Sequence, residues 1–192
     1  MRLNHLTTCI VIMAQFALVS PASAEITSHA EDRFYVISPR SPHDIKNELR
    51  RMTPLRERGG SFNGRTDWKI DWRYQTTGDA NGCNIHDVKV NINIVTTLPA
   101  LSEYVTDPRT IKAFDRFSDA LVAHERNHGK NGLAAAQEID AALSAIPTQR
   151  DCNAVSRLAE QYSQAIINKY VQKDRQYDYT TRNGMTEGAV IY

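Results

Sequence analysis

Two histidines four residues apart, set in an apolar helical stripe, constrain this chain more than any other feature. Residues 124–128 read His-Glu-Arg-Asn-His. Apolar residues upstream recur at spacings of three and four, which predicts an amphipathic helix that begins near Asp107 and Pro108. They are Ile111, Phe114, Phe117 and Leu121. His124 and His128 continue this stripe, so the helix turns two polar imidazoles toward the core.

Histidines at this spacing can bind one metal ion. Residues four apart on a helix lie about 40° apart around its axis, so both imidazoles can reach the same ion. The pattern matches the zinc-hydrolase motif HExxH, in which the intervening glutamate accepts a proton from the attacking water. The alternative is a pair of hydrogen-bonded core histidines. The spacing favours a site with His124 and His128 as ligands, Zn²⁺ as cofactor and Glu125 as catalytic base.

The N-terminal segment has the features of a secretory signal peptide. A short, weakly basic start is followed by an apolar run from Cys9 to Val19 and by small residues up to Ala24. We therefore expect residues 1–24 to be removed, and residues 25–192 to form a single periplasmic or secreted domain without a membrane span. Cleavage removes one arginine and no acid, which changes 23 basic and 22 acidic residues to 22 of each. This balance gives no electrostatic case for nucleic-acid binding.

The predicted mature chain keeps two cysteines, Cys83 and Cys152. In an oxidising compartment, a single remaining pair is most simply interpreted as a disulfide. Metal ligation is the alternative, but neither cysteine has a CxxC spacing. We therefore predict a disulfide between them.

Two alternating segments predict a β-hairpin. Apolar residues occupy every second position from Trp68 to Tyr74 and from Val88 to Ile94, on either side of a turn at residues 78–82. Residues 32–38 form an earlier predicted strand. Ser41 and Pro42 then open a short helix.

The C-terminal half is predicted to be helical. Gly129 and Gly132 predict a bend or break just after the histidine motif. Cys152 begins a further helix, and the tail from Tyr177 is expected to be an ordered loop. The predicted fold class is α+β, with a small antiparallel sheet packed on a C-terminal helical half that carries the zincin-like HExxH helix.

Several short motifs give the chain a family resemblance. They are Thr66-Asp67-Trp68 with Trp72 and Tyr74, Gly82-Cys83, Leu98-Pro99, HERNH, Cys152, and YDYTTRNGMTEG from Tyr177. In the order and spacing of these motifs, the chain resembles an uncharacterised bacterial family described as predicted secreted zinc-dependent proteases. The resemblance implies a zincin-like metallopeptidase domain that acts on peptide or protein substrates, with cell-wall peptide among the options.

The third metal ligand is open among Asp178, Glu160 and Asn183. The closing motif of the similar family tends to read Thr-x-His-Gly, whereas Asn183 stands at the histidine position here. An amide oxygen binds zinc more weakly than an imidazole nitrogen. Glu160 lies on the following helix, as in peptidases whose third ligand is a downstream glutamate. Asp178 resembles a downstream aspartate that completes the site, and we prefer it. On an unbroken helix Glu138 would be roughly 15 Å from His128.

Two functions follow from these residues. The first is a zinc metallopeptidase in which Glu125 is the general base, and Tyr177 or Tyr179 is a candidate donor to the developing oxyanion. The second is a non-catalytic metal-binding or peptide-binding cell-envelope protein, a pseudoenzyme that recognises peptide along the strand 88–95.

Overall fold

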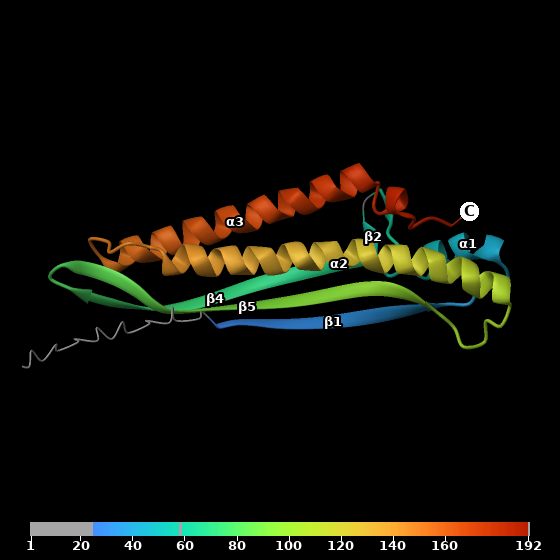
Figure 1. Cartoon of the computed structure of the whole chain (residues 1–192), viewed down its shortest axis with the longest axis horizontal. Coiled ribbons are helices and arrows are strands. Elements are labelled where there is room, and N and C mark those ends of the chain that lie inside the picture. The colour runs from blue at the N-terminus through green and yellow to red at the C-terminus, as the bar shows by residue number, and fades with distance from the viewer. Residues whose placement is uncertain (1–24, 58, 192) are drawn as a thin grey trace, which may run out of the picture.

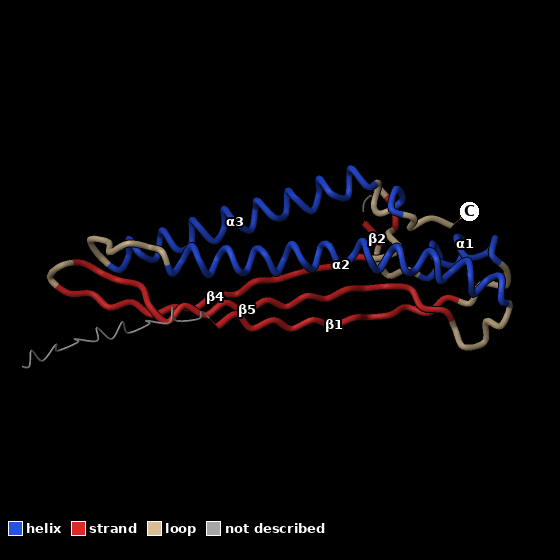
Figure 2. The backbone as a smooth tube through the Cα atoms, viewed as in Figure 1, coloured by secondary structure: helices blue, strands red, loops and turns tan. Residues whose placement is uncertain are grey.

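A three-stranded sheet covered on one face by two long helices forms the body of the protein (Figures 1 and 2). The computed structural model describes residues 25–57 and 59–191, so the predicted signal peptide lies outside the described residues. The strands are β1 (Glu25–Ile37), β4 (Arg65–Asp79) and β5 (Gly82–Leu101); the long helices are α2 (Pro108–Ser144) and α3 (Cys152–Thr181). The shorter elements are η1 (Pro42–Asp44), α1 (Ile45–Met52), β2 (Arg56–Glu57), β3 (Gly60–Ser61) and η2 (Met185–Glu187). The α+β class and the helical C-terminal half are confirmed.

Strands β4 and β5 form the predicted antiparallel hairpin. Trp68 pairs with Ile94 and Ile70 pairs with Ile92, so the apolar positions of both strands share one face. Ile70 and Ile92 are buried against the helices, whereas Lys69 and its alternating polar neighbours are exposed on the other face. The alternating pattern therefore identified both the pairing and the buried face.

The prediction of a purely antiparallel sheet is wrong, because β1 pairs with β5 in parallel. The sheet order is β1-β5-β4, so the hairpin places β5 between β4 and the first strand. Strand β1 also begins earlier than predicted, at Glu25 rather than at Asp32. Residues 27–34 are exposed. Backbone pairing to β5 holds this edge strand, and such a segment carries little apolar alternation in its sequence.

The central position of β5 also overturns the predicted peptide-binding strand. Residues 88–95 pair with β1 on one side and with β4 on the other. Their backbone hydrogen-bonding groups are therefore used inside the sheet, and an added strand cannot pair with them.

Helix α2 runs unbroken through the predicted bend at Gly129 and Gly132. A Cβ atom at residue 132 would lie 2.6 Å from Cγ of Trp68, so this glycine lets the helix approach β4 closely. The two glycines therefore do not mark a break in the helix. They lie three residues apart and both face the sheet, but only Gly132 approaches it too closely for a side chain.

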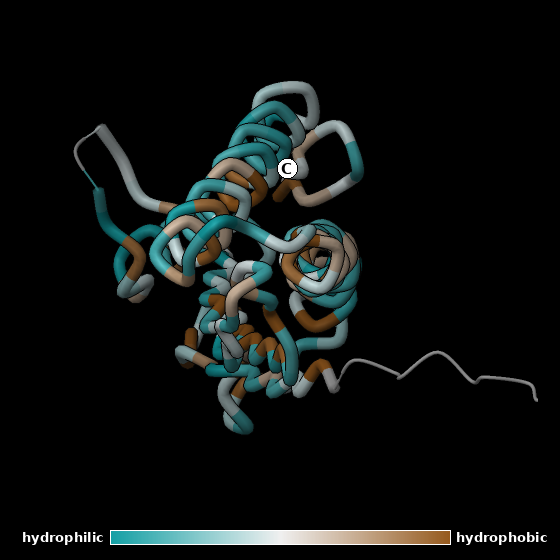
Figure 3. The backbone as a smooth tube through the Cα atoms, turned by 90° about the vertical axis from the view of Figure 1, so that its left-hand side faces the viewer, coloured by the Kyte–Doolittle hydropathy of each residue, from teal (hydrophilic) through white to brown (hydrophobic). Residues whose placement is uncertain are grey.

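Two apolar clusters lie along α2, one on each side of the histidine motif. One joins the N-terminal half of α2 to α1 and the end of β1, and its buried members include Ile37, Ile45, Phe114, Phe117 and Leu121. The other joins the C-terminal half of α2 to α3 and the hairpin, and includes Val90, Ala135, Ile139, Leu143 and Val155. The view along the long axis shows the two helices side by side above the sheet (Figure 3). His124 and His128 thus lie between the two apolar clusters.

The predicted cysteine pair is found. The sulfur atoms of Cys83 and Cys152 lie 2.08 Å apart, as in a disulfide, and join the start of β5 to the start of α3. No helix in the described part of the chain is long and apolar enough to cross a membrane.

The two glycines of α2 provide a test of this packing. In Gly129→Ala the new Cβ meets only Cγ2 of Ile94, at 3.6 Å, so the higher helix propensity of alanine should stabilise the protein by about 1 kcal/mol. In Gly132→Ala the clash with Trp68 outweighs that gain, and we expect a net destabilisation of about 1–3 kcal/mol. Urea denaturation of both variants measures the difference. Equal stabilisation of both would contradict the close approach of α2 to β4.

Candidate metal centre

Three side chains from two helices converge on one point. His124 and His128 on α2 are 2% and 6% exposed, and their Nε2 atoms lie 3.3 Å apart. Oδ1 of Asp178, in the last turn of α3, lies 3.1 Å from Nε2 of His124 and 3.0 Å from Nε2 of His128. These three residues could hold a metal ion, since one ligand atom from each lies close to the others. The buried histidine stripe predicted from the sequence is thus found.

The end of α3 fixes the position of Asp178. The expected loop from Tyr177 is wrong in its first part, because residues 177–181 continue the helix. Arg182 caps the helix in the left-handed conformation, and the N–H of Asn183 donates to the carbonyl of Asp178 at 2.8 Å. Gly184 follows with φ +80°, and a Cβ atom there would lie 3.1 Å from Cγ of His124. The chain therefore turns directly across the first histidine.

Each histidine also contacts a carboxylate through its second ring nitrogen. Nδ1 of His124 lies 2.8 Å from Oε2 of Glu187, and Nδ1 of His128 lies 3.0 Å from Oδ1 of Asp174. When each Nδ1–H donates to its carboxylate, the Nε2 lone pair is free to bind a metal ion. Carboxylates of this kind orient imidazole ligands and raise their basicity. The sequence analysis did not identify Glu187 or Asp174.

Asp174 is itself held in place by two neutral donors. Nε1 of Trp68 donates to its Oδ2 at 2.8 Å, and Nδ2 of Asn131 donates to its Oδ1 at 2.7 Å. Strand β4, helix α2 and helix α3 therefore meet at one carboxylate, which contacts His128. Trp68 was interpreted from the sequence as a core residue only, and its indole N–H adds this second role.

Tyr177 supports the other carboxylate. Its hydroxyl donates to Glu187 at 2.8 Å and accepts from Nδ2 of Asn127 at 2.7 Å. Its ring stacks on His124, with centroids 4.7 Å apart and an interplanar angle of 17°. The hydroxyl of Tyr177 is thus used within the protein, and Tyr179 is 81% exposed. The structure shows Tyr177 stacked on His124 and bonded to Glu187, and its contact with an oxyanion stays a prediction.

The carboxylates determine the protonation of the metal-free site. Burial alone would lower the pKa of His128, but hydrogen bonds to Asp174 and Asp178 raise it to about 10. Burial opposes ionisation of Asp178, yet hydrogen bonds from both histidines hold its pKa well below the usual range. Without metal, protonated imidazole therefore balances the clustered carboxylates.

Glu125 lies beside the ligands but does not join them. Its side chain is buried, and Oε2 has no hydrogen-bond partner among the described residues. Burial raises the pKa of this carboxyl group. A Cβ atom added at Gly64 would lie 3.0 Å from Oε1 of Glu125, so glycine leaves space next to the carboxylate. Thr66 donates to the backbone carbonyl of Glu125 at 3.0 Å and fixes the motif against β4.

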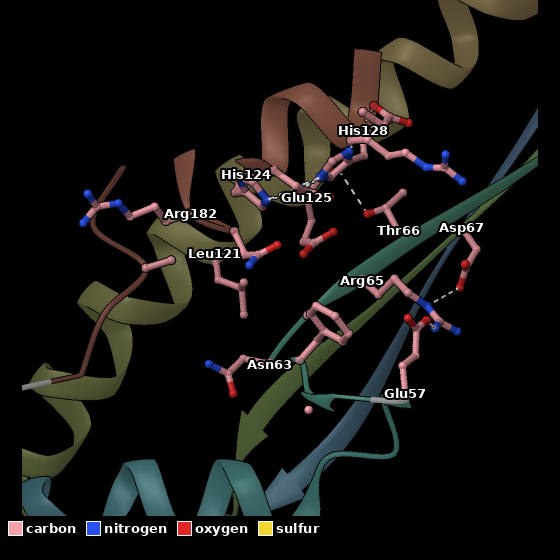
Figure 4. A pocket seen from close by; sticks show the side chains of 18 of the residues that line it. Glu57, Asn63, Arg65, Thr66, Asp67, Leu121, His124, Glu125, His128 and Arg182 are labelled. Atoms are coloured by element: carbon pink, nitrogen blue, oxygen red, sulfur yellow. Dashed lines mark hydrogen bonds and ion pairs between the residues drawn. The ribbon is translucent and has the colours of Figure 1, made fainter. Parts of the chain in front are cut away.

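A cleft of about 890 Å³ opens onto these groups (Figure 4). One wall is the segment from Glu57 into the start of β4, and the other is formed by α2, α3 and the C-terminal tail. The lining includes Leu121, His124, Glu125, His128, Ile167, Val171, Asp174, Arg175, Asp178, Arg182, Asn183, Met185 and Ala189. The buried carboxylate and the potential ligands are therefore reachable from one cavity.

The other candidate ligands lie elsewhere. Glu160 is exposed on α3 and does not line the cleft. Glu138 forms an ion pair with Lys169 at 2.7 Å. Asn183 lines the cleft, but it lies outside the three-residue group.

The spacing of the three ligand atoms fits a small tetrahedral ion. Zinc bonds to nitrogen and oxygen of about 2.0 Å require ligand atoms about 3.3 Å apart at the corners of a tetrahedron. The observed separations among the three atoms are 3.0, 3.1 and 3.3 Å. Two imidazoles and one carboxylate form a donor set that zinc accepts, and a zinc ion held by these three residues would have a fourth position for water.

Comparison with known proteins identifies a family. Residues 32–184 match a family described as bacterial protein of unknown function (DUF922), and the chain belongs to that family. The match includes both histidines and Asp178, whereas Glu187 lies beyond it. No curated protein and no solved structure matches the chain. An uncharacterised bacterial family was expected from the sequence, and the protease activity implied by the resemblance stays a prediction.

The two outer carboxylates should control metal affinity. We expect Asp174→Asn and Glu187→Gln each to weaken zinc binding by about 10- to 100-fold, because each removes the negative partner of a ligand imidazole. Competition against a chromophoric chelator measures the change. Glu138→Gln is the matched control, since this carboxylate pairs with Lys169 away from the site. Equal affinities in all three variants would contradict the assigned role.

The metal-free protein should lose stability as the pH rises from about 7 to 10. The pKa of His128 is about 10 in the folded protein, against 6.5 for an unperturbed imidazole. Its stabilising contribution is therefore complete below pH 6.5 and disappears as the pH passes the folded value. The urea midpoint of the parent protein and that of His128→Gln are measured at several pH values in the presence of a chelator. The difference between the two midpoints at each pH reports this contribution. A difference that does not change with pH would contradict it.

Proposed function

We propose that this protein is a zinc-dependent metallopeptidase that acts in the periplasm or outside the cell. The observation that carries the proposal is the buried carboxylate of Glu125 beside three potential ligands, all on one open cleft; its Oε2 has no hydrogen-bond partner among the described residues. A structural metal site needs no such carboxylate. A catalytic one needs a general base within reach of the reacting centre.

In this proposal His124, His128 and Asp178 hold the ion. Bound zinc would supply a Lewis acid that polarises the scissile carbonyl and activates water. Glu125 accepts the proton of the attacking water at its carboxylate and then delivers it to the leaving amine. Because the carboxylate is buried and has no competing donor at Oε2, its lone pair is available for that proton.

The cleft also gives an extended peptide a place to bind. Strand β4 is an edge strand of the sheet, and its first residues line the cleft next to Glu125. A backbone that pairs with this free edge would pass in front of the ligands. This proposed site at the start of β4 differs from the strand addition predicted at residues 88–95, which is excluded because both edges of β5 are already paired.

The proposal predicts that metal binding and turnover can be separated. We expect Glu125→Gln to retain zinc while kcat falls by about 10²- to 10⁴-fold, because only the proton acceptor is lost. His124→Ala should lose both zinc and activity. Elemental analysis and a fluorogenic peptide library provide the two readouts.

Glu160→Gln is the matched control, because this carboxylate is exposed on α3 outside the cleft. Unchanged turnover in Glu125→Gln would contradict the mechanism. Zinc held by four protein ligands, with no hydrolysis by the parent protein, would favour the non-catalytic metal-binding alternative.

A further inference from the structure

Two arginines of the cleft have no partner among the described residues. Arg175 and Arg182 are exposed and line the cleft. Within residues 25–57 and 59–191, neither guanidinium group takes part in an ion pair or a side-chain hydrogen bond. Arg65, on the opposite wall, differs from them. Its guanidinium pairs with Glu57 at 3.1 Å and with Asp67 at 2.9 Å (Figure 4). The positive charge available to a ligand is therefore on the α3 side.

The two arginines lie on either side of the third potential ligand. Arg175 precedes Asp178 by three residues, Arg182 is the cap residue four positions after Asp178, and all three line the cleft. The carboxylate of Asp178 is already held by His124 and His128. Among the described residues it forms no ion pair with either arginine.

The backbone of Arg182 supports a role for its side chain. Its φ of 54° and ψ of 50° lie in the left-handed region, where glycine is the usual helix-ending residue. An arginine in this conformation has a higher conformational free energy than a glycine would have, so the side chain at this position destabilises the helix end. A guanidinium group that contacts a ligand would explain that destabilisation.

We propose that the cleft selects anionic peptides, with one carboxylate bound by Arg175 and another, across the scissile bond, bound by Arg182. This inference rests on the proposed peptidase function. Guanidinium groups bind carboxylates through two parallel hydrogen bonds. Arg175 and Arg182 are seven positions apart along the end of α3, which corresponds to about 10 Å at the rise of a helix. About three residues of an extended peptide cover the same distance. Acidic residues on both sides of the cleaved bond match this spacing.

Peptide binding to a zinc-loaded, inactive variant tests the inference. Fluorescently labelled octapeptides with mixed central residues carry either glutamate or glutamine at the flanking positions, and fluorescence anisotropy with Glu125→Gln measures their affinity. We expect the dissociation constant of the glutamate peptides to be at least about tenfold lower than that of the glutamine peptides, because hydrogen bonds to charged groups are stronger than those to neutral ones. Adding Arg175→Gln or Arg182→Gln should reduce the preference on one side only.

Arg157→Gln, an exposed change on α3 outside the cleft, is the matched control and should keep the full preference. Zinc content and circular dichroism of each variant verify that the site and fold are intact. Equal affinity for both peptide sets, no binding of either, or a preference unaffected by the two cleft arginines would overturn the inference. Selective binding without hydrolysis by the parent protein would reject the peptidase and retain the anion selectivity.

Discussion

The contact between imidazoles and carboxylates at the centre of α2 organises this molecule. Two histidines occupy positions of the helical stripe that apolar residues would otherwise fill, and burial of their ring nitrogens is unfavourable unless each has a partner. The partners come from the last turns of α3 and from the C-terminal tail. The need of His124 and His128 for hydrogen-bond partners therefore explains why residues 174–187 pass close to α2.

Much of the site could be predicted because it depends on helical spacing. Asp178 was preferred because it resembles a downstream aspartate that completes such a site, whereas the histidine pair and the intervening Glu125 follow from the periodicity of a helix and the chemistry of metal ligands. Asp174 could have been found in the same way. Asp174 and Asp178 are four residues apart on α3, which matches the four-residue spacing of the histidines on α2, so two rows of side chains meet across the helix pair.

Other features could not be read from local pattern. The parallel pairing of β1 with β5 depends on how the hairpin lies next to β1 in the folded protein. In addition, β1 is a mostly exposed edge strand, so its sequence shows almost no alternation of apolar and polar residues. Gly129 and Gly132 were expected to bend or break the helix, because a sequence does not reveal the tryptophan packed against Gly132. Glu187 lies in a short 3₁₀ turn, so only the tertiary path of the tail relates it to His124.

The attachment of α3 has a consequence for how the protein responds to its surroundings. The N-terminal end of this helix is joined to the sheet by the disulfide, and its C-terminal end is held by the cluster around His124 and His128. A reductant acts on the first attachment, whereas a change of proton concentration acts on the second. The two ends of helix α3 are thus held by chemically different contacts, and the apolar cluster with α2 and the hairpin packs between them.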